Sequence, residues 1–349
     1  MRNFVVIVVT QFQMTNQFPY TLVSKHDLCV QMNRLGGSRT PFLFIVDYKT
    51  DKGYVIKTDE LDERFVRFAI SEGVTLSHTA TSMPINENDI RWEIKPIGLA
   101  EYKPKFDYVV EQIRLGNSFL TNLTQPTEVK TNLCLPDFYE RGSAKYKLWL
   151  KDTFTVLSPE TFVQIKDGQI SSFPMKGTID ASIPHAEEII LNDPKEKAEH
   201  ATIVDLIRND LSLVAEQVEV KRYRYIDKLT TNKQDLLQVS SEISGRLPEN
   251  YRERLGDILF SLLPAGSICG APKLKTLDII EQAEGYERRF YTGICGWFDG
   301  ENLDSAVMIR FIEQSGDKLF FKSGGGITSQ SELEKEYEEL IQKVYVPIR

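Results

Sequence analysis

The chain has 349 residues, of which 41% are hydrophobic and 26% charged, as expected for an ordinary globular protein. Its 42 basic and 50 acidic residues give a net charge of −8, which argues against a general nucleic-acid-binding or anionic-membrane surface. The four cysteines show no CxxC spacing, so the sequence predicts neither a zinc knuckle nor a disulfide framework and favours a reducing cytoplasm.

The first hundred residues show no catalytic pattern. The apolar run at residues 4–9 is too short to span a bilayer, and we interpret it as a strand or a non-native extension, since Met14 could also begin the chain. Strand-like runs follow at 42–46 and 53–56, separated by polar turns. We expect residues 1–100 to form a shortened N-terminal lobe.

The second part, residues 101–349, begins with a helix predicted from Lys105 to a stop near Gly116 and a strand at 119–124. Because the sequence has no obvious linker between the two parts, we expect them to pack intimately and not to form independent domains. The remaining predicted elements are strands near 152–165 and 168–175, helices near 194–214, 250–262 and 272–284, paired strands near 291–321, and a final helix near 332–345.

The helix near 194 carries acidic residues on one face. Asp193 is expected to cap it before Pro194, which places Glu196 and Glu199 three residues apart, followed by His200. Glu196 could instead simply close a capping box with Asp193, because charged helix faces are usually just solvated.

The last helix repeats this arrangement. With Ser331 as the cap, Glu336, Glu339 and Lys343 share one face, while Glu334 could close a capping box. Carboxylates from two helices suit Mg²⁺, which takes one or two of them directly and keeps several waters.

Two glycine-containing segments could meet an anion. Residues 264–273 combine glycines with Ser267 and a proline in a helix's first turn, but lack the lysine placement of a Walker phosphate loop. Gly324, Gly325 and Gly326 follow a strand and would allow close backbone approach to a ligand. Each segment could equally be only a turn.

Two further side chains suit an acidic ligand. Arg310 lies in the strand-like run 306–311, where an inward guanidinium would need a carboxylate partner. The second side chain is Tyr291. Considered without a family resemblance, Arg310 could instead be a surface residue on an edge strand, and Tyr291 could be an aromatic residue of the core.

These blocks, with Ser158-Pro159-Glu160 and the run from Ser172 to Thr178, occur in an order that resembles the chorismate-utilising enzymes over roughly residues 100–349. The resemblance implies an α+β protein, a layered sandwich of two large, mostly antiparallel sheets flanked by helices, with the site between the sheets. Residues 101–349 would then be the chorismate-binding catalytic region.

The resemblance also implies roles for the acidic helices and the anion pocket. Glu199 and Glu339 would bind Mg²⁺ directly, Glu196 and Glu336 would hold its waters, and Lys343 would face a substrate carboxylate. The residues expected to clasp one carboxylate of chorismate are Ser267, Tyr291, Arg310, Gly324, Gly325 and Gly326.

The branch of the family is indicated by Lys176 in Pro174-Met175-Lys176-Gly177-Thr178. Aminodeoxychorismate-forming members have Pro-x-Lys-Gly-Thr, whereas anthranilate-forming members usually have alanine at the lysine. Isochorismate- and salicylate-forming members carry a lysine base where this chain has Leu120, so they are disfavoured. The resemblance therefore implies amination of chorismate at C4, with 4-aminobenzoate and folate as the later products.

The implied mechanism makes Lys176 the nucleophile at C2 of chorismate and Glu160 the acid and base at C4. Ammonia would come from a separate glutamine amidotransferase subunit, because no Cys/His glutaminase arrangement is present. Leu120, Gln238 and Ile179 depart from common family residues. The alternatives are an anthranilate synthase component I, which releases pyruvate, and a catalytically silent subunit that binds chorismate or metal.

Overall fold

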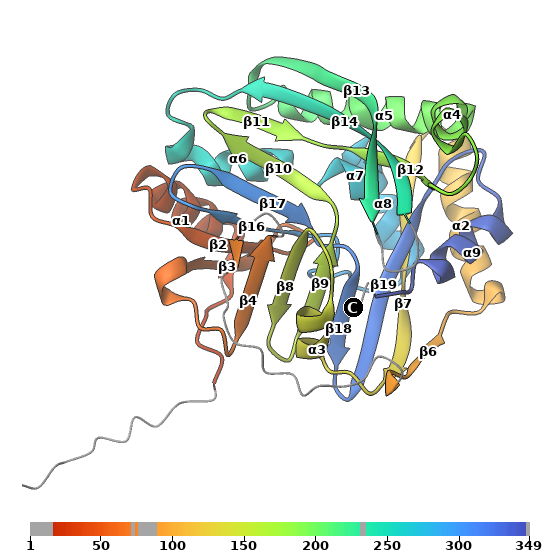
Figure 1. Cartoon of the computed structure of the whole chain (residues 1–349), viewed down its shortest axis with the longest axis horizontal. Helices are drawn as coiled ribbons and strands as arrows, with labels where there is room; N and C mark the ends of the chain where they lie inside the picture. The colour runs from red at the N-terminus through yellow and green to blue at the C-terminus, as the bar shows by residue number, and fades with distance from the viewer. Residues whose placement is uncertain (1–16, 71–73, 76–88, 231–234, 347–349) are drawn as a thin grey trace, which may run out of the picture.

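The structure, a computed structural model, describes residues 17–70, 74–75, 89–230 and 235–346, so the apolar run at 4–9 and Met14 lie outside the described residues. Two large sheets stack face to face, with helices on their outer sides and at one end (Figure 1). All the strand pairs are antiparallel. The α+β sandwich predicted from the sequence is confirmed.

Sheet A contains, in spatial order, β1 (Val23–Ser24), β3 (Lys52–Lys57), β2 (Phe42–Val46), β16 (Ile294–Phe298), β17 (Leu303–Val307), β10 (Thr161–Lys166), β11 (Gln169–Ser172), β14 (Asp235–Arg246) and β12 (Met175–Asp180), with β13 (Glu216–Thr230) also pairing with β14. Sheet B contains β15 (Gly270–Ala271), β7 (Leu120–Thr131), β19 (Lys318–Ile327), β18 (Phe311–Ser315), β9 (Phe154–Ser158), β8 (Tyr146–Leu150), β4 (Val66–Ile70) and β5 (Val74–Thr75), with β6 (Trp92–Lys95) pairing with β7.

The α-helices are α1 (Lys25–Gly37), α2 (Leu99–Arg114), α3 (Leu135–Arg141), α4 (Ala186–Asn192), α5 (Pro194–Leu211), α6 (Leu255–Leu262), α7 (Gly266–Cys269), α8 (Lys273–Glu284) and α9 (Leu333–Gln342). Short 3₁₀ helices are η1 (Thr58–Glu60) and η3 (Tyr251–Arg254). None of the helices in the described ranges is long and apolar enough to cross a membrane.

Strand β2 shows how the layers form. All five of its residues are buried. Successive side chains of a strand point to opposite faces of the sheet, so both faces must be covered here. Phe42, Phe44 and Val46 pack in a core with residues of α1 and α6, whereas Leu43 and Ile45 pack against sheet B. Sheet A is therefore covered by helices on one side and by sheet B on the other.

Strands from the first hundred residues enter both sheets, since β2 pairs with β16 and β4 pairs with β8. The division into a lobe of residues 1–100 and a region of residues 101–349 stays a proposal.

Helix α2 begins at Leu99, six residues before the predicted start at Lys105. Pro104 lies inside the helix and cannot donate to the carbonyl of Ala100, but Ala100 is exposed, so water can satisfy that oxygen. Burial of Tyr102 together with Phe106 extends the apolar face backwards past the proline. Helices α1 and α3 and the long β13–β14 hairpin were not predicted.

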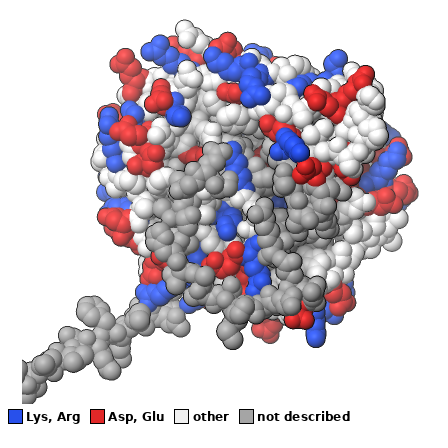
Figure 2. All heavy atoms as spheres, in the orientation of Figure 1, with Lys and Arg blue, Asp and Glu red and all other residues white. Residues whose placement is uncertain are grey.

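The face shown in Figure 2 carries acidic and basic side chains interspersed, without a broad region of one sign.

Candidate functional site

Two chain segments cross between the sheets side by side. The segment from β9 to β10 carries Glu160, and the segment from β17 to β18 carries Arg310. Backbone hydrogen bonds join these crossings, since the Val307 N–H donates to the Glu160 carbonyl at 3.1 Å and the Leu157 N–H donates to the Arg310 carbonyl at 3.2 Å. Pairing of strands far apart in sequence thus brings Glu160 and Arg310 together where the sheets meet.

The prediction that Arg310 lies in a strand over 306–311 is wrong. Arg310 follows the end of β17 with a φ of 51°, because the chain turns there from sheet A to sheet B. Its guanidinium lies 5.0 Å from the centre of the Tyr345 ring, and Nη2 is 3.5 Å from the Tyr345 hydroxyl. Arg310 nevertheless remains close enough to Glu160 to lower the pKa of that carboxyl.

Glu160 accepts a 2.5 Å hydrogen bond from the hydroxyl of Ser267 in α7. Burial raises the pKa of the Glu160 carboxyl above its ordinary value, and this effect exceeds the opposing effects of the Ser267 hydrogen bond and the charges of Lys176 and Arg310. A carboxyl with a raised pKa beside two cations is suited to give and take a proton.

Lys176 lies on β12, the edge strand of sheet A, opposite Val239 of β14. Its Nζ is 4.0 Å from Glu199 Oε2 on α5, and its side chain is 23% exposed. The same Nζ lies 3.5 Å from the place a Cβ would occupy at Gly326 of β19. Lys176 therefore reaches from the edge of sheet A to a glycine of sheet B.

Three of the predicted metal-binding carboxylates lie beside glycines. A Cβ at Gly325 would be 3.3 Å from Glu336 Oε2 and 3.5 Å from Glu339 Oε1, both on α9. A Cβ at Gly177 would be 3.0 Å from Glu196 Oε2 on α5. The two acidic helices thus lie against neighbouring strands, with β12 and β19 between them.

The acidic helices differ in how they begin. Asp193 accepts from the Glu196 N–H at 2.9 Å, as predicted, but α9 is preceded by Glu332 at its N-cap position rather than by Ser331. The Ser331 hydroxyl instead donates to Glu336 Oε1 at 2.7 Å. Ser331 therefore orients Glu336 and does not cap the helix.

The carboxylates are balanced by ammonium groups. Lys343 Nζ lies 2.5 Å from Glu339 Oε1 and donates to the Gly324 carbonyl at 2.9 Å, while Lys176 lies near Glu199. Within the described ranges, no group of three or more His, Cys, Asp or Glu side chains is arranged to hold a metal ion. The donor set has the oxygen chemistry that Mg²⁺ prefers. Its carboxylates come from α5 beside β12 and from α9 beside β19.

Tyr291 is buried and packs against Phe311, with ring centres 5.8 Å apart. Burial raises its pKa, and the charges of Arg310 and Glu160 both act on its hydroxyl. Tyr291 is therefore a core residue, as considered from the sequence, and it also lies near Arg310 and Glu160.

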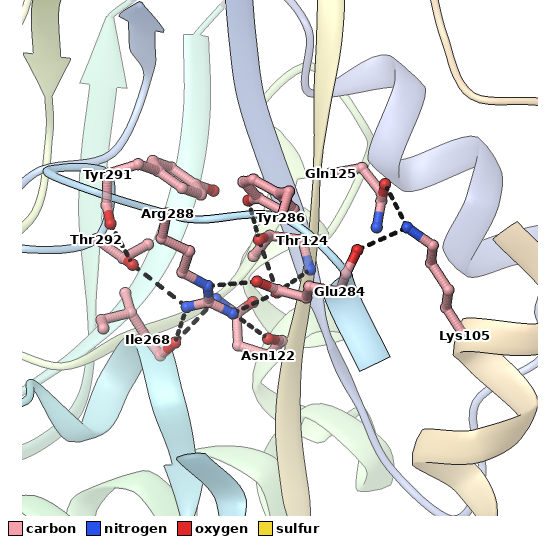
Figure 3. Close-up of polar contacts among 10 residues, drawn as sticks. All are labelled: Lys105, Asn122, Thr124, Gln125, Ile268, Glu284, Tyr286, Arg288, Tyr291 and Thr292. Atoms are coloured by element: carbon pink, nitrogen blue, oxygen red, sulfur yellow. Dashed lines mark hydrogen bonds and ion pairs between the residues drawn. The ribbon is translucent and has the colours of Figure 1, made fainter. Parts of the chain in front are cut away.

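A buried ion pair between Glu284 and Arg288 was not predicted from the sequence (Figure 3). The spacing of four residues is typical of helical ion pairs, but helix α8 ends at Glu284, so the spacing does not indicate this pair. The surroundings of His200 were not predicted either. His200 is buried with Nε2 2.7 Å from the Ser241 hydroxyl, and burial, with help from Arg224 and Lys176, lowers its pKa to about 4.

Leu120 lies beside Gly326, because a Cβ at Gly326 would be 3.0 Å from Leu120 Cδ1. The side chain at the position of the isochorismate-type lysine base is thus apolar and close to Lys176. Gln238 and Ile179 lie on β14 and β12, where they pair with Thr178 and Leu237.

Gly326→Ala is expected to lower the free energy of unfolding by about 1–3 kcal/mol, the usual effect of overpacking. The added methyl would crowd Leu120 Cδ1 at 3.0 Å, whereas Lys176 Nζ at 3.5 Å would be in ordinary van der Waals contact with it. Urea denaturation measures the change. A Gly326→Ala variant as stable as the wild type would contradict the close packing of Gly326 against Leu120.

Several known proteins are similar to this chain. The chain is 50% identical over 326 residues to an uncharacterized PabA-like protein of Pasteurella multocida, covering 93% of this chain and all of the relative. It is 31% identical over 260 residues to aminodeoxychorismate synthase component 1 of Salmonella typhimurium, covering 70% of this chain and 56% of the relative. It is 36% identical over 254 residues to anthranilate synthase component 1 of Methanothermobacter thermautotrophicus, covering 68% and 53%.

Solved structures share the fold. The menaquinone-specific isochorismate synthase of Escherichia coli matches with a TM-score of 0.71 at 15% identity, covering 93% of this chain and 82% of that one. Anthranilate synthase component I of Streptococcus pneumoniae matches with a TM-score of 0.67 at 22% identity, covering 86% and 79%. The model of the family described as chorismate binding enzyme matches residues 34–349. The chain therefore belongs to the chorismate binding enzyme family.

Proposed function

We propose that this protein aminates chorismate at C4 to give 4-amino-4-deoxychorismate in the cytoplasm, as a step towards 4-aminobenzoate and folate. The observation that supports the proposal is the position of Lys176, whose Nζ lies between the two sheets near Gly326 and Glu199 and acts electrostatically on Glu160. A nucleophilic amine and an acid–base carboxyl are the two groups that this reaction requires.

In the proposed reaction, the neutral amine of Lys176 forms a bond to C2 of chorismate. The ring double bonds shift, the C4–oxygen bond breaks, and Glu160 protonates the departing hydroxyl to give water. Ammonia then bonds to C4, the double bonds return, and the bond from C2 to Lys176 breaks. Glu160 recovers its proton from the new C4 ammonium group. The enolpyruvyl side chain is kept throughout.

Substrate binding is assigned to residues around these groups. Ser267, Tyr291, Arg310 and the β19 residues Gly324, Gly325 and Gly326 would hold one carboxylate of chorismate, and Lys343 would face the other. Lys343 would then exchange its present partner Glu339 for substrate. We further propose that ammonia is supplied by a separate glutamine amidotransferase subunit.

Glu199 and Glu339 would hold Mg²⁺ directly, and Glu196 and Glu336 would hold its waters. When bound, the ion would neutralise a substrate carboxylate and the acidic side chains around it. Without such a cation, bringing an anionic substrate beside four carboxylates would be costly in a site of low dielectric.

Removal of divalent metal by EDTA is expected to abolish chorismate turnover, and added Mg²⁺ is expected to restore it. The physical reason is the repulsion between the substrate carboxylates and Glu199 and Glu339. Product formation, followed by mass spectrometry before and after addition of Mg²⁺, measures the effect. Undiminished turnover in excess EDTA would show that Lys176 and Lys343 alone balance these charges.

The second candidate is an anthranilate synthase component I, because relatives of that name also match, one of them at 36% identity. It would add ammonia at C2 and release pyruvate. A third candidate is a catalytically silent subunit, for which the replacement of common family residues by Leu120 and Gln238 is the supporting observation.

The deciding experiment incubates the protein with chorismate, Mg²⁺ and excess ammonium, then identifies products by mass spectrometry with a parallel pyruvate assay. Aminodeoxychorismate without pyruvate is the expected result. Anthranilate with an equal amount of pyruvate would replace our proposal with the second candidate. Chorismate recovered unchanged, with ammonium in excess, would favour the silent subunit.

A further inference from the structure

The buried ion pair of Glu284 and Arg288 lies directly behind the candidate site. Both residues are 2% exposed, and Arg288 Nη2 is 2.6 Å from Glu284 Oε1. Helix α8 ends at Glu284, and Gly285 then adopts a left-handed conformation with a φ of 68°. This turn folds Arg288 back onto the last residue of the helix.

Every N–H of the Arg288 guanidinium has an acceptor (Figure 3). Nε donates to Glu284 Oε2 at 2.8 Å, and Nη2 donates to Glu284 Oε1 and to the Asn122 carbonyl at 2.7 Å. Nη1 donates to the Ile268 carbonyl and to the Thr292 hydroxyl, both at 3.2 Å. A guanidinium has five N–H donors in a fixed planar fork, so no other side chain can make this set of bonds.

Two of the acceptors outside α8 belong to segments that carry predicted substrate-binding residues, since Ile268 follows Ser267 in α7 and Thr292 follows Tyr291. The third, Asn122 of β7, is paired with Gly326 of β19. One side chain therefore links the segments of Ser267 and Tyr291 to the strand that pairs with Gly326.

Glu284 ties the pair to sheet B. Its Oε1 accepts from both the N–H and the hydroxyl of Thr124, at 2.8 and 2.7 Å. A buried ion pair is weak evidence for stability by itself, because the cost of removing both charges from water can exceed their attraction. The geometry that the pair imposes on its neighbours is therefore its more informative property.

We propose that Arg288 is a positioning residue, which holds Ser267, Tyr291 and Gly326 at the mutual distances that chorismate requires. This inference rests on the proposed function, because it assumes that those three residues meet the substrate. Displacement of reacting or binding groups by about 1 Å can cost about a hundredfold in rate.

The test uses the full chain with three variants. Arg288→Lys keeps the buried positive charge but loses the fork, and is expected to lower kcat/KM for chorismate about a hundredfold. Thr292→Val removes one acceptor of Arg288 and also the 2.6 Å bond that the Thr292 hydroxyl donates to the Tyr291 carbonyl. It should give a smaller loss than Arg288→Lys, and Thr292→Ser should rescue it because serine keeps the hydroxyl. These Thr292 variants keep the test decisive if Arg288→Lys does not fold.

Arg67→Lys is the matched control for a purely structural effect. Arg67 is 5% exposed and lies on β4, where its partners include Glu140 at 2.7 Å and the Glu63 carbonyl at 3.0 Å. It should lose stability without losing turnover per folded molecule. Chorismate affinity, measured by titration calorimetry with Mg²⁺, is the second readout because it does not require amination.

The expected outcome is a loss of turnover and of chorismate affinity for Arg288→Lys and Thr292→Val, with both retained in Arg67→Lys and Thr292→Ser. Wild-type rates and affinity for Arg288→Lys would overturn the inference while leaving the proposed function intact. If the wild type binds chorismate but does not aminate it, the proposed function fails and the affinities alone decide the role of Arg288. Absence of chorismate binding by the wild type would overturn both.

Discussion

Lys176→Ala is expected to lower the rate of aminodeoxychorismate formation on the order of a thousandfold or more, as for loss of other covalent nucleophiles. The variant lacks the amine that would bond to C2, while Glu160, Ser267 and the acidic helices remain. Any residual reaction should therefore be diverted, with ammonia itself adding at C2. Initial rates and product masses, compared with wild type at saturating ammonium, measure both effects.

Lys147→Ala is the control for this variant. Lys147 is a half-buried lysine on β8 that donates to the Tyr139 carbonyl at 3.0 Å, away from β12 and β19. Its replacement should reduce stability and leave turnover unchanged. Full aminodeoxychorismate synthesis by Lys176→Ala would refute the assignment of the lysine as nucleophile.

Glu160→Gln is expected to reduce turnover by about 10²–10⁴-fold, the usual contribution of a positioned general acid or base. Glutamine has nearly the same shape and can still accept from the Ser267 hydroxyl, but it cannot transfer a proton to the leaving hydroxyl. Chorismate affinity should therefore change much less than kcat. Substrate titrations that separate kcat from KM measure this, and an equal loss in affinity and rate would show that Glu160 mainly binds substrate.

The same variant has a second, pH-dependent effect on stability. Burial raises the pKa of Glu160 in the folded protein above its ordinary value of 4.5, so the folded state binds this proton more tightly than the unfolded state. Its contribution to the free energy of unfolding is fully present below pH 4.5 and is lost as the pH rises through the folded-state pKa. Glu160→Gln should lack this loss, and urea denaturation of both proteins at pH 4.5 and pH 8 would show a smaller difference for the variant.

The sequence predicted the strands of the sandwich well where one pattern determined them. The run 42–46 became β2 because an uninterrupted apolar strand is stable only when both of its faces are covered. The run 306–311 has the same apolar character, but it is divided between two sheets, and the turn at Arg310 depends on that division. The apolar character of a run predicts that its residues are buried, but it does not predict which of the two sheets each residue belongs to.

The site was predictable in its composition but not in its assembly. Glu160, Lys176 and Ser267 were identified from motifs, whereas their proximity depends on crossings between sheets that pair residues about 150 positions apart, such as Glu160 with Val307. Arg288 escaped prediction because its five acceptors come from four separate segments. No local pattern in the chain encodes such a meeting.

The most direct test of the account is to quench the wild-type protein with acid during the first turnover of chorismate and Mg²⁺ without ammonium, then to map modified peptides by mass spectrometry. The account predicts a peptide in which Lys176 carries the mass of chorismate less one water, and which disappears when ammonium is added before quenching. An unmodified Lys176 peptide at every time point, from a sample that makes aminodeoxychorismate at its normal rate once ammonium is supplied, would contradict it.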